Sequence, residues 1–134
     1  VGLPVFKGSL ESIAGTSACD VMVGGFYLDT NQDAQAVSFQ RNGSSWVSQT
    51  YPGRKELMSL IKRSSFKYLL SSQSFDGWDW IADIGTSNGD STLNWFRPAE
   101  EFYRPLASWS IPGSTMLMVA GEGNGGYISS ASCQ

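Results

Sequence analysis

The chain has 134 residues, with nine Lys and Arg against twelve Asp and Glu, which gives a formal net charge of −3. This balance leaves no basic stripe that could neutralise phosphates, so we expect no nucleic-acid partner. No apolar run approaches the ~18 residues that a membrane-spanning helix needs, and we expect no membrane-spanning segment. The length suits one hydrophobic core, which predicts a single domain over residues 1–134.

The composition indicates where such a domain works. Charged residues make up 16% of the chain, against roughly 25% in an average soluble protein. Aromatic residues reach 13%, and the chain has 15 glycines. This combination is typical of turn-rich β domains outside the cell, in which uncharged polar side chains supply the solubility. We therefore expect an extracellular or cell-surface location.

Two cysteines, Cys19 and Cys133, lie near opposite ends of the chain, which has no histidine. Without a CxxC pair or a histidine, neither a metal site nor a thioredoxin-like motif has much support, and we expect no cofactor. A disulfide between the two cysteines is the simplest interpretation and implies an oxidising compartment. Two buried free thiols are the alternative.

The start of the chain is predicted to lead into a strand. Residues 1–18 have no readable register and allow either a short helix or an extended arm. β-Branched and aromatic residues predict a strand over residues 19–28. Within it, the pair Gly24-Gly25 indicates a bulge or the close approach of another backbone.

The pair Asn42-Gly43 is the strongest short hairpin signal in the sequence. Strands are predicted on either side of it, over residues 36–40 and 46–51. With Ser44 the pair also forms a glycosylation sequon, but the turn alone accounts for it.

Residues 54–64 predict the one amphipathic helix. Its apolar stripe would consist of Leu57, Met58, Leu60 and Ile61. Lys62 and Arg63 would fall in the last turn, where the helix dipole favours cations.

Further strands are predicted at residues 66–70, 75–85, 92–96, 115–120 and 127–133, with a single helical turn at 98–103. The fold class that follows is mainly β. We expect an antiparallel sheet or sandwich of about seven strands with one amphipathic helix.

The strand within residues 75–85 is unusual because it contains two Trp and three Asp. At strand period one of its faces is apolar and consists of Trp78, Trp80, Ala82 and Ile84. The other face is acidic and consists of Asp79, Ile81 and Asp83. The apolar face would enter a core, and the acidic face would meet water or a polar ligand.

A glycan site needs an exposed aromatic ring for stacking, beside groups that hydrogen-bond sugar hydroxyls. Two segments offer both, and they contain the predicted ligand-binding residues Asp76, Trp78, Asp79, Trp80, Asn88, Asp90, Asn94 and Trp95. If these segments are neighbouring strands joined by the turn at residues 86–91, the residues converge at one end of a sheet. The alternative is that the tryptophans lie in the core.

No catalytic residue is predicted. Gly89-Asp90-Ser91 resembles the first block of the GDS-type lipases and esterases, but that family's triad needs a histidine, which this chain lacks. Carboxylate chemistry leaves one enzymatic alternative, a small glycosidase. Its acid and base would come from Asp76, Asp79, Asp83, Glu100 and Glu101.

A family resemblance is carried by Gly15-Thr16-Ser17-Ala18-Cys19, Gly24, Gly25, Asp29 and the run from Ser38 through Gly43 to Trp46. These residues resemble a segment of bacterial type IVb minor pilins of the shufflon (PilV-like) group. The match covers about thirty of the 134 residues. Phe39 stands where the pattern has its second Cys, so the resemblance implies Cys133 as the partner of Cys19. It also implies the distal domain of a pilus-tip adhesin that contacts glycans or lipopolysaccharide on another cell.

A second resemblance is carried by Glu56-Leu57-Met58-Ser59-Leu60-Ile61-Lys62-Arg63-Ser64. This run is similar to a stretch of capsid proteins in picorna-like viruses of insects and algae, although the Arg-x-Leu of that stretch is missing. It implies a capsid or coat component that assembles through its aromatic surface.

From these observations we expect a non-enzymatic, extracellular binding domain. Its partners would be a glycan or cell-surface receptor, together with other subunits of a surface assembly. The coat component and the small glycosidase are the alternatives.

Overall fold

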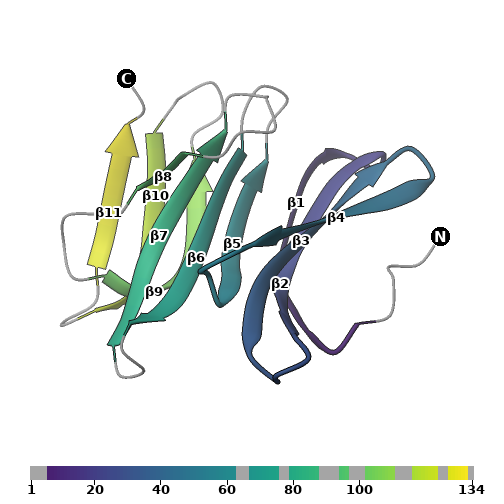
Figure 1. The fold of residues 1–134 in the computed structure, drawn as a ribbon. Helices are drawn as coiled ribbons and strands as arrows, with labels where there is room; N and C mark the ends of the chain where they lie inside the picture. Colours follow the sequence, from purple (N-terminus) through teal and green to yellow (C-terminus); the bar gives the residue numbers. More distant parts are fainter. Residues whose placement is uncertain are drawn as a thin grey trace.

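The computed structural model describes residues 6–62, 67–75, 79–87, 94–96, 102–110, 116–123 and 127–132. These residues form eleven strands in three antiparallel sheets (Figure 1), and none of them is helical. The predicted mainly β, antiparallel fold is therefore confirmed. The expected number of about seven strands is too low.

The first sheet is a meander of four strands in sequence order, β1 (Gly8–Ser17), β2 (Asp20–Leu28), β3 (Ala34–Asn42) and β4 (Ser45–Tyr51). Its last three strands confirm those predicted at 19–28, 36–40 and 46–51, and the N-terminal arm becomes β1. The β3–β4 hairpin closes at the pair Asn42 and Ser45, so Gly43 takes the first central position of the turn, with φ +62°. Glycine is the residue that adopts this conformation without strain.

The second sheet is also a meander, formed by β5 (Glu56–Lys62), β6 (Lys67–Phe75), β7 (Asp79–Ser87) and β8 (Asn94–Phe96). The third sheet has the order β11 (Tyr127–Ser132), β10 (Met116–Gly123) and β9 (Phe102–Ser110). Strand β9 contacts β5, β6 and β7, and β5 contacts the first three strands of the first sheet. The second sheet therefore links the other two (Figure 1).

The predicted helix over residues 54–64 is wrong, because its described part contains strand β5. Four consecutive residues of this strand, from Leu57 to Leu60, are buried. One face of β5 packs against the first sheet, and on the other the Ser59 hydroxyl lies 2.5 Å from that of Ser108 in β9. In a short run that is apolar on both faces, the spacing of the apolar residues does not distinguish a strand from a helix.

The single helical turn expected at 98–103 is also wrong in its described part. Phe102 and Tyr103 belong to strand β9. Residues 98–101 lie outside the described residues.

The core between the first two sheets is a cluster of Met22, Ala36, Tyr51, Leu57 and Leu60. Gly24 of β2 lies against it. A Cβ at this position would be 3.0 Å from Leu60 Cδ1 and 3.2 Å from Leu57 Cβ. The missing Cβ at Gly24 thus lets the side chains of β5 pack directly onto β2. The close approach of another backbone that was predicted for the glycine pair is confirmed at Gly25, where a Cβ would clash with the Ser9 carbonyl oxygen of β1.

The opposite face of the first sheet carries a second buried cluster of Val23, Val37 and Phe39. Phe6 packs against it, with its ring centroid 5.2 Å from that of Phe39. Both faces of this sheet thus bury apolar side chains. No helix among the described residues is long and apolar enough to cross a membrane.

Candidate binding pocket

The predicted ligand-binding residues that the structure describes, Asp79, Trp80, Asn94 and Trp95, lie on strands β7 and β8, which are antiparallel neighbours as expected. Trp95 pairs with Gly85 and Asn94 with Thr86, in the last part of β7. Asp79 and Trp80 begin the same strand. Trp80 and Gly85 are five positions apart, roughly 17 Å of strand, so the described members of the two segments do not converge. The remaining four, Asp76, Trp78, Asn88 and Asp90, lie outside the described residues.

Trp95 is half-buried and packs against the core cluster. Its ring meets that of Tyr51 edge to face, with centroids 5.9 Å apart. The Arg54 guanidinium lies over the ring, 3.8 Å from its centroid. A Cβ at Gly85 would be 3.0 Å from several ring atoms. These contacts make Trp95 part of the scaffold and not an open platform for stacking a sugar.

Asp83, on the face of β7 that was expected to meet water or a ligand, is buried with 5% exposure. Its Oδ2 atom lies 3.5 Å from Nη2 of Arg54. The guanidinium offsets part of the cost of burying this charge, so the carboxylate can lie inside the protein and not in solvent. Asp83 is thus engaged in an ion pair inside the molecule.

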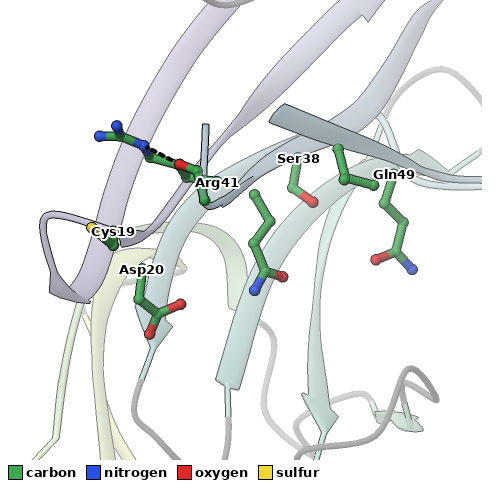
Figure 2. Close-up of a pocket in the computed structure, with 8 residues that line it drawn as sticks. Cys19, Asp20, Ser38, Arg41 and Gln49 are labelled. Atoms are coloured by element: carbon green, nitrogen blue, oxygen red, sulfur yellow. Dashed lines mark hydrogen bonds between the residues drawn. The ribbon is translucent and has the colours of Figure 1, made fainter. Parts of the chain in front are cut away.

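A pocket of about 440 Å³ opens instead on the first sheet (Figure 2). It is half open to solvent, and it is lined by Cys19, Asp20, Ser38, Gln40, Arg41, Gly43, Val47 and Gln49. Strands β3 and β4 form one wall, and the turn from β1 into β2 forms another. Sequence reasoning did not assign this pocket.

The hairpin register explains why these side chains meet. Ser38 pairs with Gln49 and Gln40 pairs with Val47, so the four side chains share one face of the sheet. The same face carries Ala36 into the core. Strand β5 covers the face at β1, β2 and β3, while Val47 and Gln49 of β4 stay exposed. The polar pocket therefore lies beside the part of this face that β5 packs against.

Two side-chain amides in this pocket are available to a ligand. Neither Gln40 nor Gln49 hydrogen-bonds through its amide to another described residue. Each amide provides two donors and one acceptor. Figure 2 shows Gln49 and Ser38 on adjacent strands at one side of the pocket.

The Ser38 hydroxyl is already engaged. It lies 2.8 Å from Oη of Tyr51, and both residues are buried. Burial raises the pKa of Tyr51 to about 12, so this phenol stays neutral at physiological pH. The pair joins the floor of the pocket to the core.

Asp20 lies across the pocket from Gln49 (Figure 2). Its carboxylate accepts hydrogen bonds from Nζ of Lys62 and from Oγ1 of Thr16. The bond from Lys62 is the main reason that the pKa of Asp20 is lowered, and the bond from Thr16 adds to it. Asp20 is therefore ionised at neutral pH, and Lys62 balances its charge.

Arg41 and Cys19 complete the rim. Nε of Arg41 donates to the Gly43 carbonyl at 3.0 Å, and Nη1 donates to the Ala18 carbonyl at 2.9 Å. Cys19, in the turn between β1 and β2, is an exposed free thiol. The predicted disulfide at Cys19 is therefore not formed in the structure, and its expected partner Cys133 lies outside the described residues.

One signal could have located this pocket from the sequence. The Asn-Gly turn sets the hairpin register, and that register places Ser38, Gln40 and Gln49 on one face. The contribution of Asp20 could not be foreseen, because it depends on how the β1–β2 turn lies against the hairpin.

The described residues contain no group of three or more His, Cys, Asp or Glu side chains placed to hold a metal ion. Comparison of the chain with protein-family models, with curated proteins and with solved structures finds no match.

Proposed function

We propose that this chain is a non-enzymatic, cell-surface binding domain that holds part of a glycan in the pocket between β2, β3 and β4. The observation that carries the proposal is the pair of unengaged amides, Gln40 and Gln49, in a half-open pocket of about 440 Å³. Small-molecule sites have volumes of about 300–1,000 Å³, so the pocket is large enough for a sugar.

The chemistry of the pocket suits a neutral ligand rich in hydroxyl groups. Amides both donate and accept hydrogen bonds, as sugar hydroxyls do. Val47 is 54% exposed at the same wall and offers an apolar contact to a sugar ring. The charges nearby are balanced, because Asp20 is paired with Lys62 and Arg41 donates to backbone carbonyls. An anionic or cationic ligand would gain less here than an uncharged one.

Two further observations support a binding role without catalysis. The chain has no histidine to act as a general base. Asp20 and Asp83 are each paired with a cationic side chain, which disfavours the protonated carboxylic acid that glycoside hydrolysis requires. The low charge content and the pilin resemblance support a place in a larger surface assembly, where such a domain would contact another cell.

A glycan array probed with the intact chain tests the proposal, followed by calorimetric titration of the glycans that bind. We expect Gln40→Ala and Gln49→Ala each to weaken binding about tenfold or more, as the loss of one or two hydrogen bonds implies. Thr50→Ala is the matched control, because Thr50 lies on β4 but points to the opposite face. Absence of binding to any array glycan, or unchanged binding by the Gln40→Ala/Gln49→Ala double variant, would overturn it.

One observation favours the coat component as a second candidate. Trp109 of β9 is 56% exposed, beside the exposed Ala107. Both alternate with Ser108, which contacts β5, so they lie on the outer face of the third sheet. If this face mediates assembly, Trp109→Ser abolishes the formation of large particles at high concentration, as electron microscopy would record. Persistence of such particles in the variant, or their absence from the wild-type protein, would exclude the coat-component function.

A further inference from the structure

We infer that two copies of this chain associate through strand β4, which pairs antiparallel with β4 of the second copy and joins the two first sheets into one. The inference is independent of the glycan proposal. It rests on which backbone groups β4 leaves unpaired, on the residues it contains, and on how such a strand matches a copy of itself.

The register of the β3–β4 hairpin determines which backbone groups face outward. Asn42 and Ser45 flank a two-residue turn, and such a pair exchanges hydrogen bonds with itself. Since bonded and non-bonded pairs alternate in an antiparallel ladder, Ser48 and Thr50 direct their N–H and C=O groups away from β3. No other described residue bonds to Ser48 or Thr50, and β4 is the last strand of its sheet.

Strand β4 lacks the features that usually block a sheet edge. Its sequence, Ser-Trp-Val-Ser-Gln-Thr-Tyr, has no charged residue and no proline, and its ladder with β3 has no irregularity. The other edge of the same sheet, β1, carries Glu11 and two register shifts, after Leu10 and after Gly15. Charges and bulges of this kind prevent edge-to-edge pairing. Only one of the two edges is therefore open to a further strand.

The strand is also complementary to itself. When two β4 strands run antiparallel about Gln49, Ser48 of each copy lies opposite Thr50 of the other. Outward-facing residues then meet outward-facing residues, and each pair can exchange two backbone hydrogen bonds. Because the strand carries no charge, no like charges face one another across a two-fold axis. A second copy of the chain therefore supplies a strand whose outward-facing backbone groups match those of β4.

The pairing has a consequence for the pocket. Gln49 lines the pocket, and it would lie on the two-fold axis opposite Gln49 of the second copy. Such non-hydrogen-bonded pairs have their Cα atoms about 4.5 Å apart, so the two Gln49 side chains would lie next to each other. The two pockets would then open side by side on one face of the joined sheet.

Sedimentation of the intact chain over a wide concentration range tests the inference. We expect a reversible dimer, and we expect Ser48→Pro to raise its dissociation constant about tenfold or more. Proline removes an outward donor but no bond to β3, so we expect the fold to be retained. Ser48→Ala keeps the N–H group and is the matched control. A wild-type monomer at all concentrations, or equal effects of proline and alanine, would overturn the inference.

A cross-link provides the second test, and it holds even if Ser48→Pro fails to fold. In a Cys19→Ser/Cys133→Ser background, Gln49→Cys places one thiol on the expected axis. We expect oxidation to give a covalent dimer of the folded chain, whereas Thr50→Cys in the same background, which points to the opposite face and lies off the axis, gives little. Equal cross-linking at both positions, or none at Gln49→Cys, would contradict the proposed register. Loss of the dimer in Trp109→Ser would place the interface on the third sheet instead.

Discussion

The guanidinium of Arg54 lies 3.8 Å from the centroid of the Trp95 ring, so that a cation covers the tryptophan that the sequence suggested as a sugar platform. The same guanidinium reaches the buried Asp83 at 3.5 Å. Arg54 lies in the connection between β4 and β5, whereas Trp95 and Asp83 belong to strands β8 and β7 of the second sheet. One side chain thus connects the two sheets through a cation–π contact and an ion pair.

The first prediction concerns this connection. We expect Arg54→Ala to lower the free energy of unfolding by about 3–5 kcal/mol, because it leaves the Asp83 carboxylate buried without this cation. Asp83→Asn in the Arg54→Ala background should restore part of the loss. Urea denaturation followed by tryptophan fluorescence measures both. A loss below about 1 kcal/mol for Arg54→Ala, the size of a surface pair, would show that the contact is not structural.

The second prediction concerns the contact between β2 and β5. We expect Gly24→Ala to destabilise the fold by about 1–3 kcal/mol, because the new Cβ would lie 3.0 Å from Leu60 and 3.2 Å from Leu57. Ser48→Ala is the control, since the Ser48 side chain is exposed on β4 and its replacement adds no atom to the core. Thermal unfolding of the two variants should show a clear loss only at Gly24.

The sequence was most informative where a local signal determined the structure. Asn42-Gly43 predicted the hairpin that forms, because glycine fits the turn and the turn fixes the register. The run from Leu57 to Leu60 was misassigned, because its burial comes from two other sheets that a local pattern does not reveal. Tertiary packing, and not propensity, decided that segment.

The candidate site was less predictable than the fold. Gln40 and Gln49 look like ordinary strand residues until the turn from β1 into β2 brings Asp20 to the same pocket. Conversely, Trp95 was predicted to bind a ligand and Asp83 to lie on a face that meets water or a polar ligand, because nothing in their own segments predicts Arg54 between them. Partners distant in sequence determined both outcomes.

The third prediction concerns acid stability. The pKa of Asp20 is lowered by hydrogen bonds from Lys62 and Thr16, so the folded state binds its proton more weakly than the unfolded state does. The stability gained from this carboxylate is therefore present above the unfolded value of 3.8 and is lost as the pH falls through the folded pKa. We expect Lys62→Met to reduce the loss of stability below that pH. Denaturant titrations at neutral and acid pH would show it, and an unchanged pH profile in the variant would contradict it.

The fourth prediction concerns the thiol at the rim of the pocket. Cys19 is exposed and free, so we expect it to react with a thiol reagent in the folded chain at a rate close to that of the unfolded chain. Mass spectrometry of labelled peptides identifies the site. Failure of Cys19 to label without prior reduction, followed by labelling after it, would show instead that the residue is oxidised in solution.

The last prediction concerns the buried pair Ser38 and Tyr51, whose hydroxyl oxygens are 2.8 Å apart. Burial raises the pKa of Tyr51 to about 12, above the unfolded value of about 10. Its contribution to stability is therefore complete below about pH 10 and is lost as the pH rises towards 12, because the unfolded state releases this proton first. We expect Tyr51→Phe to remove the part of the stability loss at alkaline pH that comes from this phenol.

At neutral pH, Ser38→Ala should lower the free energy of unfolding by about 1–3 kcal/mol, since it leaves the phenol without this partner. In the Tyr51→Phe background the same change should have a smaller effect, and a double-mutant cycle from denaturant titrations measures the difference. Equal effects of Ser38→Ala in both backgrounds would show that the two hydroxyls do not interact.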